Sequence, residues 1–264
     1  MSSTFRTHAI VLGSRDHLEA DRYYSVLTDE HGKLELRARG SRKISSKLSS
    51  HLEPFALCDL MVVRGRFGDI VAGVERLELY PIIRVDAQKL ELAMQSFHLV
   101  EVGTRDRQPD EHLFYFLRMW LKFLNDAPSF TEERSRFLLS AFTLRLLGYL
   151  GYRPELAMCV KCQVPVRHEA FRWHGLRGGV VCLSCVEREP EQWFTSRPFC
   201  DETLKLMRLS LGFPLLRLLD VRLPGSLLHE FHDAVDSLLI AHFPVIPLMI
   251  LNNSASHLSI DSLQ

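Results

Sequence analysis

Four cysteines of this chain stand in two Cys-x-x-Cys pairs, Cys159 with Cys162 and Cys182 with Cys185. Residues 163–181 separate the pairs, and a connector of about 15 to 20 residues is typical of four-cysteine zinc sites. Such a connector can fold back so that all four thiolates lie about 2.3 Å from one tetrahedral ion. The spacing therefore predicts a closed, structural Zn²⁺ site, which holds the fold together and performs no chemistry.

Two disulfides are the alternative use of these cysteines, but they require an oxidising compartment. Residues 1–6 open the chain without the apolar core of a signal peptide, so we expect a cytoplasmic protein and favour zinc. His168 and His174 lie between the pairs and could each replace a cysteine. Four cysteines already complete the shell, so we expect both histidines to be exposed loop residues.

The composition is that of a soluble globular protein with room for two or three cores. The chain has 264 residues, of which 47% are apolar and 24% charged. Its 32 basic and 32 acidic residues cancel, so any nucleic-acid site must come from local charge asymmetry. No apolar run approaches the roughly 18 residues that span a bilayer, and we expect no membrane association.

The first eighty residues read as short strands separated by turn signals. The third strand alternates strictly, with Leu34, Leu36 and Ala38 on one face and charged residues on the other. Five strands without a long helix favour a small closed barrel of the OB-fold type over a sandwich. The predicted strands span residues 8–13, 22–28, 33–39, 57–63 and 70–79.

From about residue 86 the apolar period becomes helical, and we expect three stripes to face a core. The first stripe is Leu90, Ala93, Met94, Phe97, Val100 and Glu101; the second is Leu113, Phe116, Leu117, Trp120, Leu121 and Leu124; the third is Phe137, Leu138, Ala141, Leu144, Arg145 and Gly148. Helical spacing resumes at residues 201–211 and 227–243, after the cysteine module.

These patterns predict an α+β multidomain chain with an OB-fold barrel, a helical bundle and a zinc module. The expected domains are an OB-fold DNA-binding domain at 1–80, a helical domain in two parts at 81–155 and 191–250, a zinc-binding module at 156–190 and a polar C-terminal tail at 251–264.

Basic residues outnumber acidic ones between residues 33 and 66, most densely in the Gly- and Ser-containing loop 40–50. Such a loop can lie along phosphates without reading sequence, although charge runs also occur as simple solvated surface. The barrel favours single-strand binding, and Tyr23, Tyr24 and Phe67 are the aromatic residues that could stack on bases. Because alternation sends Tyr23 and Tyr24 to opposite faces, we expect at most one of these two to meet a strand. The predicted DNA contacts are Arg37, Arg39, Arg42, Lys43, Lys47, Arg64 and Arg66.

Signatures of catalysis are missing from the sequence. It has no phosphate-binding Gly-x-x-x-x-Gly-Lys loop and no Gly-x-Ser-x-Gly elbow. His51 and Glu53 match the His-x-Glu of zinc deaminases, but Met158 and Val181 stand where the proline before the cysteine pair should be. A second cysteine pair would also close the open metal position that catalysis needs. We therefore expect no enzymatic activity.

Segments along nearly the whole chain, taken in order, resemble the RecO family of bacterial recombination mediators. They are Ala9–Leu12, Glu19–Arg22, Thr28–Gly32, Gly40–Lys43, Leu52–Phe55, Leu144–Pro154 before the first cysteine pair and Gly178–Cys182 entering the second. None of these motifs is diagnostic alone, but their order and spacing together are specific.

The resemblance implies an OB-fold, a helical domain and a zinc module. It also implies binding of single- and double-stranded DNA, strand annealing and, with RecR, loading of RecA onto DNA coated by single-stranded DNA-binding protein. These activities suit a cytoplasmic, nucleoid-associated protein. The family's site for the acidic tail of the coat protein lies in the helical domain; candidate basic residues are Arg118, Lys122, Arg134, Arg136, Lys205 and Arg208.

Two other functions fit the same residues. One is a zinc-containing adaptor that binds proteins without direct DNA activity. The other is a zinc enzyme acting on nucleic acid, which would need a cluster of carboxylates that does not stand out in the sequence.

Overall fold

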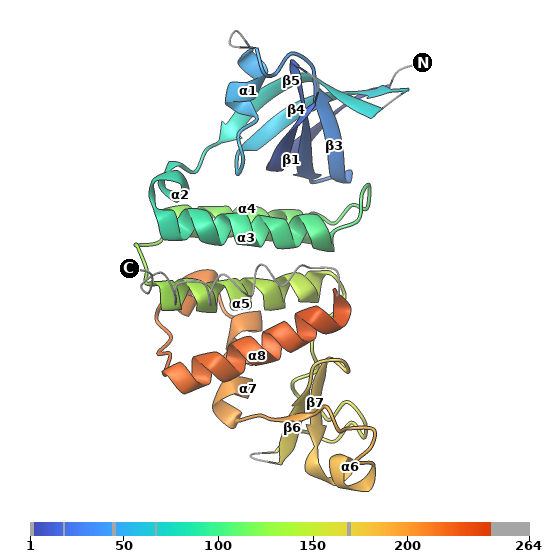
Figure 1. The fold of residues 1–264 in the computed structure, drawn as a ribbon, viewed down its shortest axis with the longest axis vertical. Helices are drawn as coiled ribbons and strands as arrows, with labels where there is room; N and C mark the ends of the chain where they lie inside the picture. The colour runs from blue at the N-terminus through green and yellow to red at the C-terminus, as the bar shows by residue number, and fades with distance from the viewer. Residues whose placement is uncertain (1–2, 18, 44–45, 67, 168–169, 244–264) are drawn as a thin grey trace, which may run out of the picture. The chain divides into compact units, whose positions relative to one another are not determined.

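The computed structural model describes residues 3–243 except 18, 44–45, 67 and 168–169 (Figure 1). The chain divides into two compact units, which we describe separately: unit 1 contains residues 1–153 and 207–224, and unit 2 contains residues 154–206 and 225–264. Several sequence expectations lie outside the described residues, namely those for His168, Phe67, the loop positions 44–45 and the tail 251–264.

Unit 1 begins with a closed five-stranded barrel in the order β1-β2-β3-β5-β4, which confirms the predicted OB-type barrel. β1 is long enough to pair with β2 through residues 9–17 and with β4 through residues 4–10. A short parallel pairing of Leu36 with Asp69 and of Arg37 with Ile70 closes the barrel. The strands are β1 (Thr4–His17), β2 (Asp21–Thr28), β3 (Gly32–Ala38), β4 (Leu57–Gly65) and β5 (Gly68–Glu78).

Strict alternation in β3 places Leu34, Leu36 and Ala38 in the barrel core, as the sequence predicts. The hairpin between β2 and β3 ends at Gly32, whose φ is +71°. A Cβ atom at this position would lie 2.4 Å from the carbonyl oxygen of Gln108, so both the backbone angle and the close approach require glycine.

A short helix, α1 (Lys47–His51), begins within the basic segment 40–50, which the sequence pattern described only as a loop. Leu48 and Leu52 pack from this segment onto the barrel core. The segment is helical because this conformation lets it add apolar side chains to the barrel core.

The rest of unit 1 is helical, and polar residues begin its three long helices. Asp86, Asp110 and Thr131 each accept a hydrogen bond from a backbone N–H of the first turn. The elements are α2 (Pro81–Val85), α3 (Ala87–Gly103), α4 (Glu111–Asp126), α5 (Glu132–Tyr149) and the 3₁₀ helix η1 (Leu215–Leu219).

One part of the predicted helical core is wrong. In α3 Met94 is 59% exposed, and Leu90 and Glu101 are only half-buried. These three residues share the helical spacing of the core but line an open groove that faces the barrel. Ala93, Phe97 and Val100 are buried as expected. Helical periodicity identifies an apolar face but does not show whether a neighbour covers it.

The barrel and α3 are joined by polar contacts at the carboxyl end of this helix. The Nζ atom of Lys33 donates hydrogen bonds to the carbonyl oxygens of Glu101 and Thr104, at 2.7 and 2.9 Å. Arg107 forms an ion pair of 2.8 Å with the buried carboxylate of Asp69 on β5. The cation and the helix-end carbonyls stabilise each other.

Unit 2 contains a three-stranded sheet in the order β7-β6-β8, and the indole N–H of Trp173 donates a 2.8 Å hydrogen bond to the hydroxyl of Ser237. Its elements are β6 (Phe171–His174), β7 (Gly179–Cys182), α6 (Leu183–Arg188), β8 (Arg197–Pro198), the first part of α7 (Asp201–Gly212) and α8 (Gly225–His242). None of the helices in the described part of the chain combines the length and apolar character needed to span a lipid bilayer.

Candidate metal centre and nucleic-acid interface

The four paired cysteines meet in unit 2, with all four Sγ atoms within 4.8 Å of one another. The Sγ atoms of Cys162 and Cys182 are 3.7 Å apart. That separation is too long for a disulfide of about 2.05 Å, but it matches the roughly 3.8 Å between sulfurs around a tetrahedral ion with 2.3 Å bonds. The donor set therefore fits Zn²⁺, with Cys159 and Cys185 completing the shell.

Local backbone structure brings the two cysteine pairs together. Cys182 ends β7 and precedes the first turn of α6, which carries Cys185. The backbone N–H of Val160 donates a hydrogen bond of 2.9 Å to the carbonyl of Val180, so the first pair is held beside the strand that leads into the second. The cluster thus rests on regular elements rather than on a loop alone.

The cysteines of the cluster differ in how readily they ionise. Burial opposes ionisation of Cys159, but backbone N–H groups of Cys162 and Cys182 stabilise its thiolate and lower its pKa to about 7. Burial and the neighbouring thiols raise the pKa of Cys185 to about 12. All four sulfurs can be thiolates together only if a metal ion compensates their charge.

The expectation that His174 is an exposed loop residue is wrong. His174 lies on β6, is 3% exposed and is not part of the cysteine cluster. Its Nδ1 accepts a hydrogen bond of 3.1 Å from the backbone N–H of Arg177, and its Nε2 lies 3.1 Å from the hydroxyl of Thr195. Its ring meets Trp193 edge-on, and Trp193 packs against the buried cysteines. Burial lowers the pKa of His174, with Arg177 adding to the effect, which favours the neutral ring. Through Trp193 the residue packs behind the cysteine cluster.

On the barrel, several of the predicted DNA contacts already have partners. Arg37 forms an ion pair of 2.6 Å with Asp21, and Arg42 lies 3.5 Å from Asp16. The guanidinium of Arg64 lies over the ring of Phe5, 5.2 Å from its centroid. The local excess of positive charge is therefore smaller than the sequence window suggested, because Asp16 and Asp21 precede that window and fold back onto it.

Arg39, Arg42 and Lys43 lie on the turn after β3 and are exposed, as is Arg66 at the turn between β4 and β5. The side chain of Lys47 lies outside the described part of the structure. The turn after β3 is therefore where the predicted basic residues gather on the surface.

Sequence reasoning missed Arg15, which the strand register places in one row with Tyr23 and Arg37 across β1, β2 and β3. The Arg15 guanidinium lies 4.5 Å from the centroid of the Tyr23 ring, and His17 meets the same ring edge-on. Tyr24 points the other way and is buried in the core, so one of the two tyrosines is on the outer face as predicted. The alternation of β1 could have revealed Arg15, had its pairing with β2 been known.

Comparison with known proteins matches both halves of the chain. Residues 1–79 match the family model described as recombination protein O N terminal, and residues 86–249 match recombination protein O C terminal. The chain belongs to the RecO family.

Individual relatives agree with the family models. DNA repair protein RecO of Cutibacterium acnes is 38% identical over 69% of this chain and 74% of its own length. The protein of the same name from Bacillus subtilis is 30% identical over 88% of this chain and 86% of its own length, and that of Desulforudis audaxviator is 29% identical over 90% and 91%. These descriptions name recombination and DNA repair, and membership of the RecO family agrees with the expectation that the chain is not an enzyme.

In this RecO-family chain, some basic residues considered for binding an acidic tail serve the fold. Arg134 donates to the carbonyl oxygens of Leu218 and Val221, at 2.8 and 2.6 Å, and thereby anchors the segment after η1. Arg118 is paired with Glu78 on β5. Arg136, Lys205 and Arg208 are exposed.

Lys122 is different, because it lies at a groove of about 510 Å³ formed by α4, α5 and η1 of unit 1. Tyr115, Met119 and Leu216 line this groove and are each about half or more exposed. Lys122, which forms a 3.4 Å ion pair with the exposed carboxylate of Asp126, and Arg145 supply positive charge there. Exposed apolar surface next to cations is a surface suited to an apolar, acidic peptide.

Proposed function

We propose that this RecO-family chain binds single- and double-stranded DNA, anneals complementary strands and, with RecR, helps load RecA onto DNA coated by single-stranded DNA-binding protein. The observation that carries the proposal is the match of both family models to a chain whose barrel gathers basic residues at one turn. A mediator of this kind needs phosphate contacts that ignore sequence and a separate site for the coat protein.

We assign the DNA contact to the barrel domain at 1–80, centred on the turn that carries Arg39, Arg42 and Lys43. Arg37, Lys47, Arg64 and Arg66 extend it, and the row containing Arg15 and Tyr23 offers an aromatic ring beside it. Guanidinium and ammonium groups on an exposed turn can follow a phosphate backbone, and a half-buried tyrosine can stack on a base. Such contacts also screen the repulsion between two strands during annealing.

We assign Zn²⁺ to Cys159, Cys162, Cys182 and Cys185, within the module at 156–190. The support is the sulfur separation of 3.7 Å and the mutual approach of all four Sγ atoms. The ion stabilises the fold of unit 2, because all four coordination positions are filled by protein.

We assign the acidic tail of single-stranded DNA-binding protein to the groove of α4, α5 and η1. Met119 and Tyr115 offer apolar contacts, and Lys122 offers a charge partner for carboxylates. Arg145 is fixed at the groove by donating a 2.6 Å hydrogen bond to the carbonyl of Ser210, so its position is set before any ligand binds.

Strand annealing tests the proposal most directly. Hybridisation of two complementary oligonucleotides is followed with and without the purified protein across a salt series. Acceleration that fades as salt rises is expected if phosphate contacts carry the activity. If annealing is not accelerated and no DNA binds at low salt, the protein-binding adaptor is the better description; cleavage of labelled DNA with magnesium would instead indicate an enzyme.

A further inference from the structure

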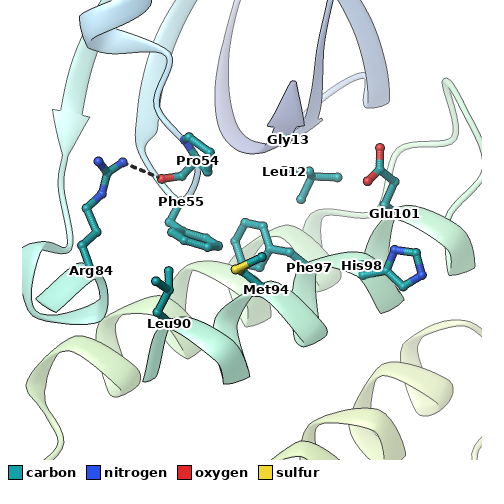
Figure 2. Close-up of a pocket in the computed structure, with 10 residues that line it drawn as sticks. All are labelled: Leu12, Gly13, Pro54, Phe55, Arg84, Leu90, Met94, Phe97, His98 and Glu101. Atoms are coloured by element: carbon teal, nitrogen blue, oxygen red, sulfur yellow. Dashed lines mark hydrogen bonds between the residues drawn. The ribbon is translucent and has the colours of Figure 1, made fainter. Parts of the chain in front are cut away.

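A second groove, of about 480 Å³, lies within unit 1 between α3 and the barrel (Figure 2). Its buried walls are Leu12, Phe55 and Phe97, and the thioether of Met94 extends over it with 59% of the residue exposed. An exposed methionine on an apolar surface can adapt its shape to different side chains. The groove is therefore an open apolar surface that no segment in the described part of the chain covers.

The backbone at one wall is strained. Phe55 has a φ of +70°, which is unfavourable for a bulky residue. Hydrogen bonds to β1 hold it there: the N–H of Phe55 donates to the carbonyl of Val11 at 3.0 Å, and the N–H of Val11 donates to Ala56 at 3.1 Å. In this conformation the Phe55 ring meets the Phe97 ring edge-on, with 4.9 Å between the ring centroids, and forms one wall of the groove.

The charged side chains at the two ends of the groove differ in whether they have an ion-pair partner (Figure 2). Arg84 stands at one end, where it donates to the carbonyl of Pro54 at 3.0 Å and pairs with Glu53 at 2.8 Å. His98 and Glu101 stand at the other end. Glu101 is half-buried, and its carboxylate has no hydrogen-bond or ion-pair partner among the described residues. One unpaired negative charge is thus left beside an apolar surface.

Lys33 binds the backbone of Glu101 but is not paired with its carboxylate. The Nζ atom of Lys33 donates to the backbone carbonyl of Glu101 and lies 3.4 Å from the carboxylate of Asp106. Its hydrogen bonds are directed at the end of α3, and its ion pair is made with a residue outside the groove.

We propose that this groove binds a segment of a partner protein that carries an apolar side chain next to a lysine or arginine. The apolar side chain would lie on Met94, Phe55 and Phe97, and the cation would pair with Glu101. The charge is opposite to that of the groove of α4, α5 and η1, where Lys122 and Arg145 favour an acidic segment. Unit 1 thus offers two apolar grooves that select partners by opposite charge, and this inference is independent of the DNA contact proposed above.

Methionine methyl groups provide a reporter for each groove, because Met94 lines one and Met119 the other. The full-length protein is labelled with ¹³C-methyl methionine, and the two signals are assigned with Met94→Leu and Met119→Leu. Two short peptides are titrated at physiological salt, one of leucine and lysine and one of leucine and glutamate. The lysine peptide is expected to shift the Met94 signal and the glutamate peptide is not.

Two variants test the chemistry of the groove. Glu101→Gln removes the charge and should weaken binding of the lysine peptide about tenfold. Gly13→Leu should block the groove, because Gly13 lines it and a Cβ atom there would meet no heavy atom within 4 Å. Glu91→Gln is the matched control: it is an exposed acid of the same helix that does not line the groove, and it should leave the affinity unchanged.

Three results would overturn the proposal: a Met94 signal that neither peptide moves, an equal response to both peptides, or equal losses in Glu101→Gln and Glu91→Gln. Thermal unfolding of each variant shows that the fold is intact. Annealing activity is measured on the same preparations, so a failure of the groove and a failure of the DNA contact are seen separately.

Discussion

The guanidinium of Arg37 lies 2.6 Å from the carboxylate of Asp21, and the other oxygen of that carboxylate accepts a 2.7 Å hydrogen bond from the backbone N–H of Gly40. One acidic side chain therefore connects the start of β2 to the end of β3 and to the turn after it. That turn carries the exposed residues Arg42 and Lys43. Asp21 both shapes the basic turn and withholds one cation from it.

Replacing Asp21 by asparagine should strengthen DNA binding. Asparagine can still accept from Gly40, but it releases Arg37 to meet a phosphate. We expect several-fold tighter binding at low salt, and a slope of log affinity against log salt that steepens by about one. Fluorescence anisotropy with a random-sequence oligonucleotide measures both. Asp233→Asn, which removes an acid of unit 2, is the control, and equal behaviour of the two variants would argue against a phosphate contact at Arg37.

Asp21→Asn should also change how the stability of the protein depends on pH. The Gly40 N–H and Arg37 hold the pKa of Asp21 below its ordinary value. The stability that the ionised Asp21 carboxylate contributes to the fold is therefore fully present above its unfolded-state pKa of about 3.9. This stability is lost as the pH falls through the lower folded-state pKa. The difference in thermal midpoint between parent and Asp21→Asn should shrink below about pH 4. A difference that stays constant from pH 7 to pH 3 would contradict this assignment.

Reversing the charge of Arg42 and Lys43 together should weaken DNA binding. Arg42→Glu with Lys43→Glu places two negative charges on an exposed turn, so affinity at low salt should fall about tenfold or more while the unfolding midpoint stays close to that of the parent. Arg136→Glu with Lys205→Glu makes the same charge change on exposed helix residues and should leave DNA binding nearly intact. Unchanged affinity in the first variant would remove the turn from the DNA site.

Loss of one metal ligand should unfold unit 2 locally. Cys159→Ser removes a buried sulfur of the cluster, so we expect bound zinc to be lost and stability and solubility to fall more than DNA binding. Elemental analysis gives the zinc content, and calorimetry with and without a chelator gives the stability. Cys200→Ser serves as the control because Cys200 lies outside the cluster. A Cys159→Ser protein that keeps its zinc and its stability would show that the four-cysteine assignment is wrong.

The buried lysine of α3 should matter for stability rather than for binding. Lys89 is 1% exposed, and its Nζ donates to the carbonyl of Ala127 at 2.5 Å, just beyond the end of α4. Lys89→Met keeps the apolar stem but leaves that carbonyl without its donor, which should cost about 1–3 kcal/mol in urea unfolding. Lys122→Met, at a 64% exposed side chain, should change stability by no more than about 0.5 kcal/mol. Equal effects would mean that the hydrogen bond at Lys89 contributes little.

Patterns that depend on local periodicity were predicted well from the sequence. The alternation of Leu34, Leu36 and Ala38 identified a barrel strand, and the apolar stripe that includes Trp120 and Leu124 identified the buried face of α4. The cysteine spacing predicted a cluster that the structure forms, because ligand spacing is set by the geometry of the site itself.

Features that depend on contacts distant in sequence were not predicted. The count of charges between residues 33 and 66 did not include Asp16 and Asp21, which reach the basic turn only through strand pairing and chain reversal. The burial of His174 depends on Thr195 and Trp193, about twenty residues later in the chain. The exposure of Met94 depends on how closely the barrel approaches α3. Such relationships are properties of tertiary packing rather than of a sequence window.

The parallel pairing of β3 with β5 has a consequence for the behaviour of many copies at once. By closing the cylinder at residues 36–37 and 69–70, it gives the end of β3 a paired neighbour on both sides, so the backbone donors and acceptors there are not available to another chain. At this part of the barrel, contacts between crowded copies must therefore be made through side chains, and salt or dilution can reverse contacts of that kind.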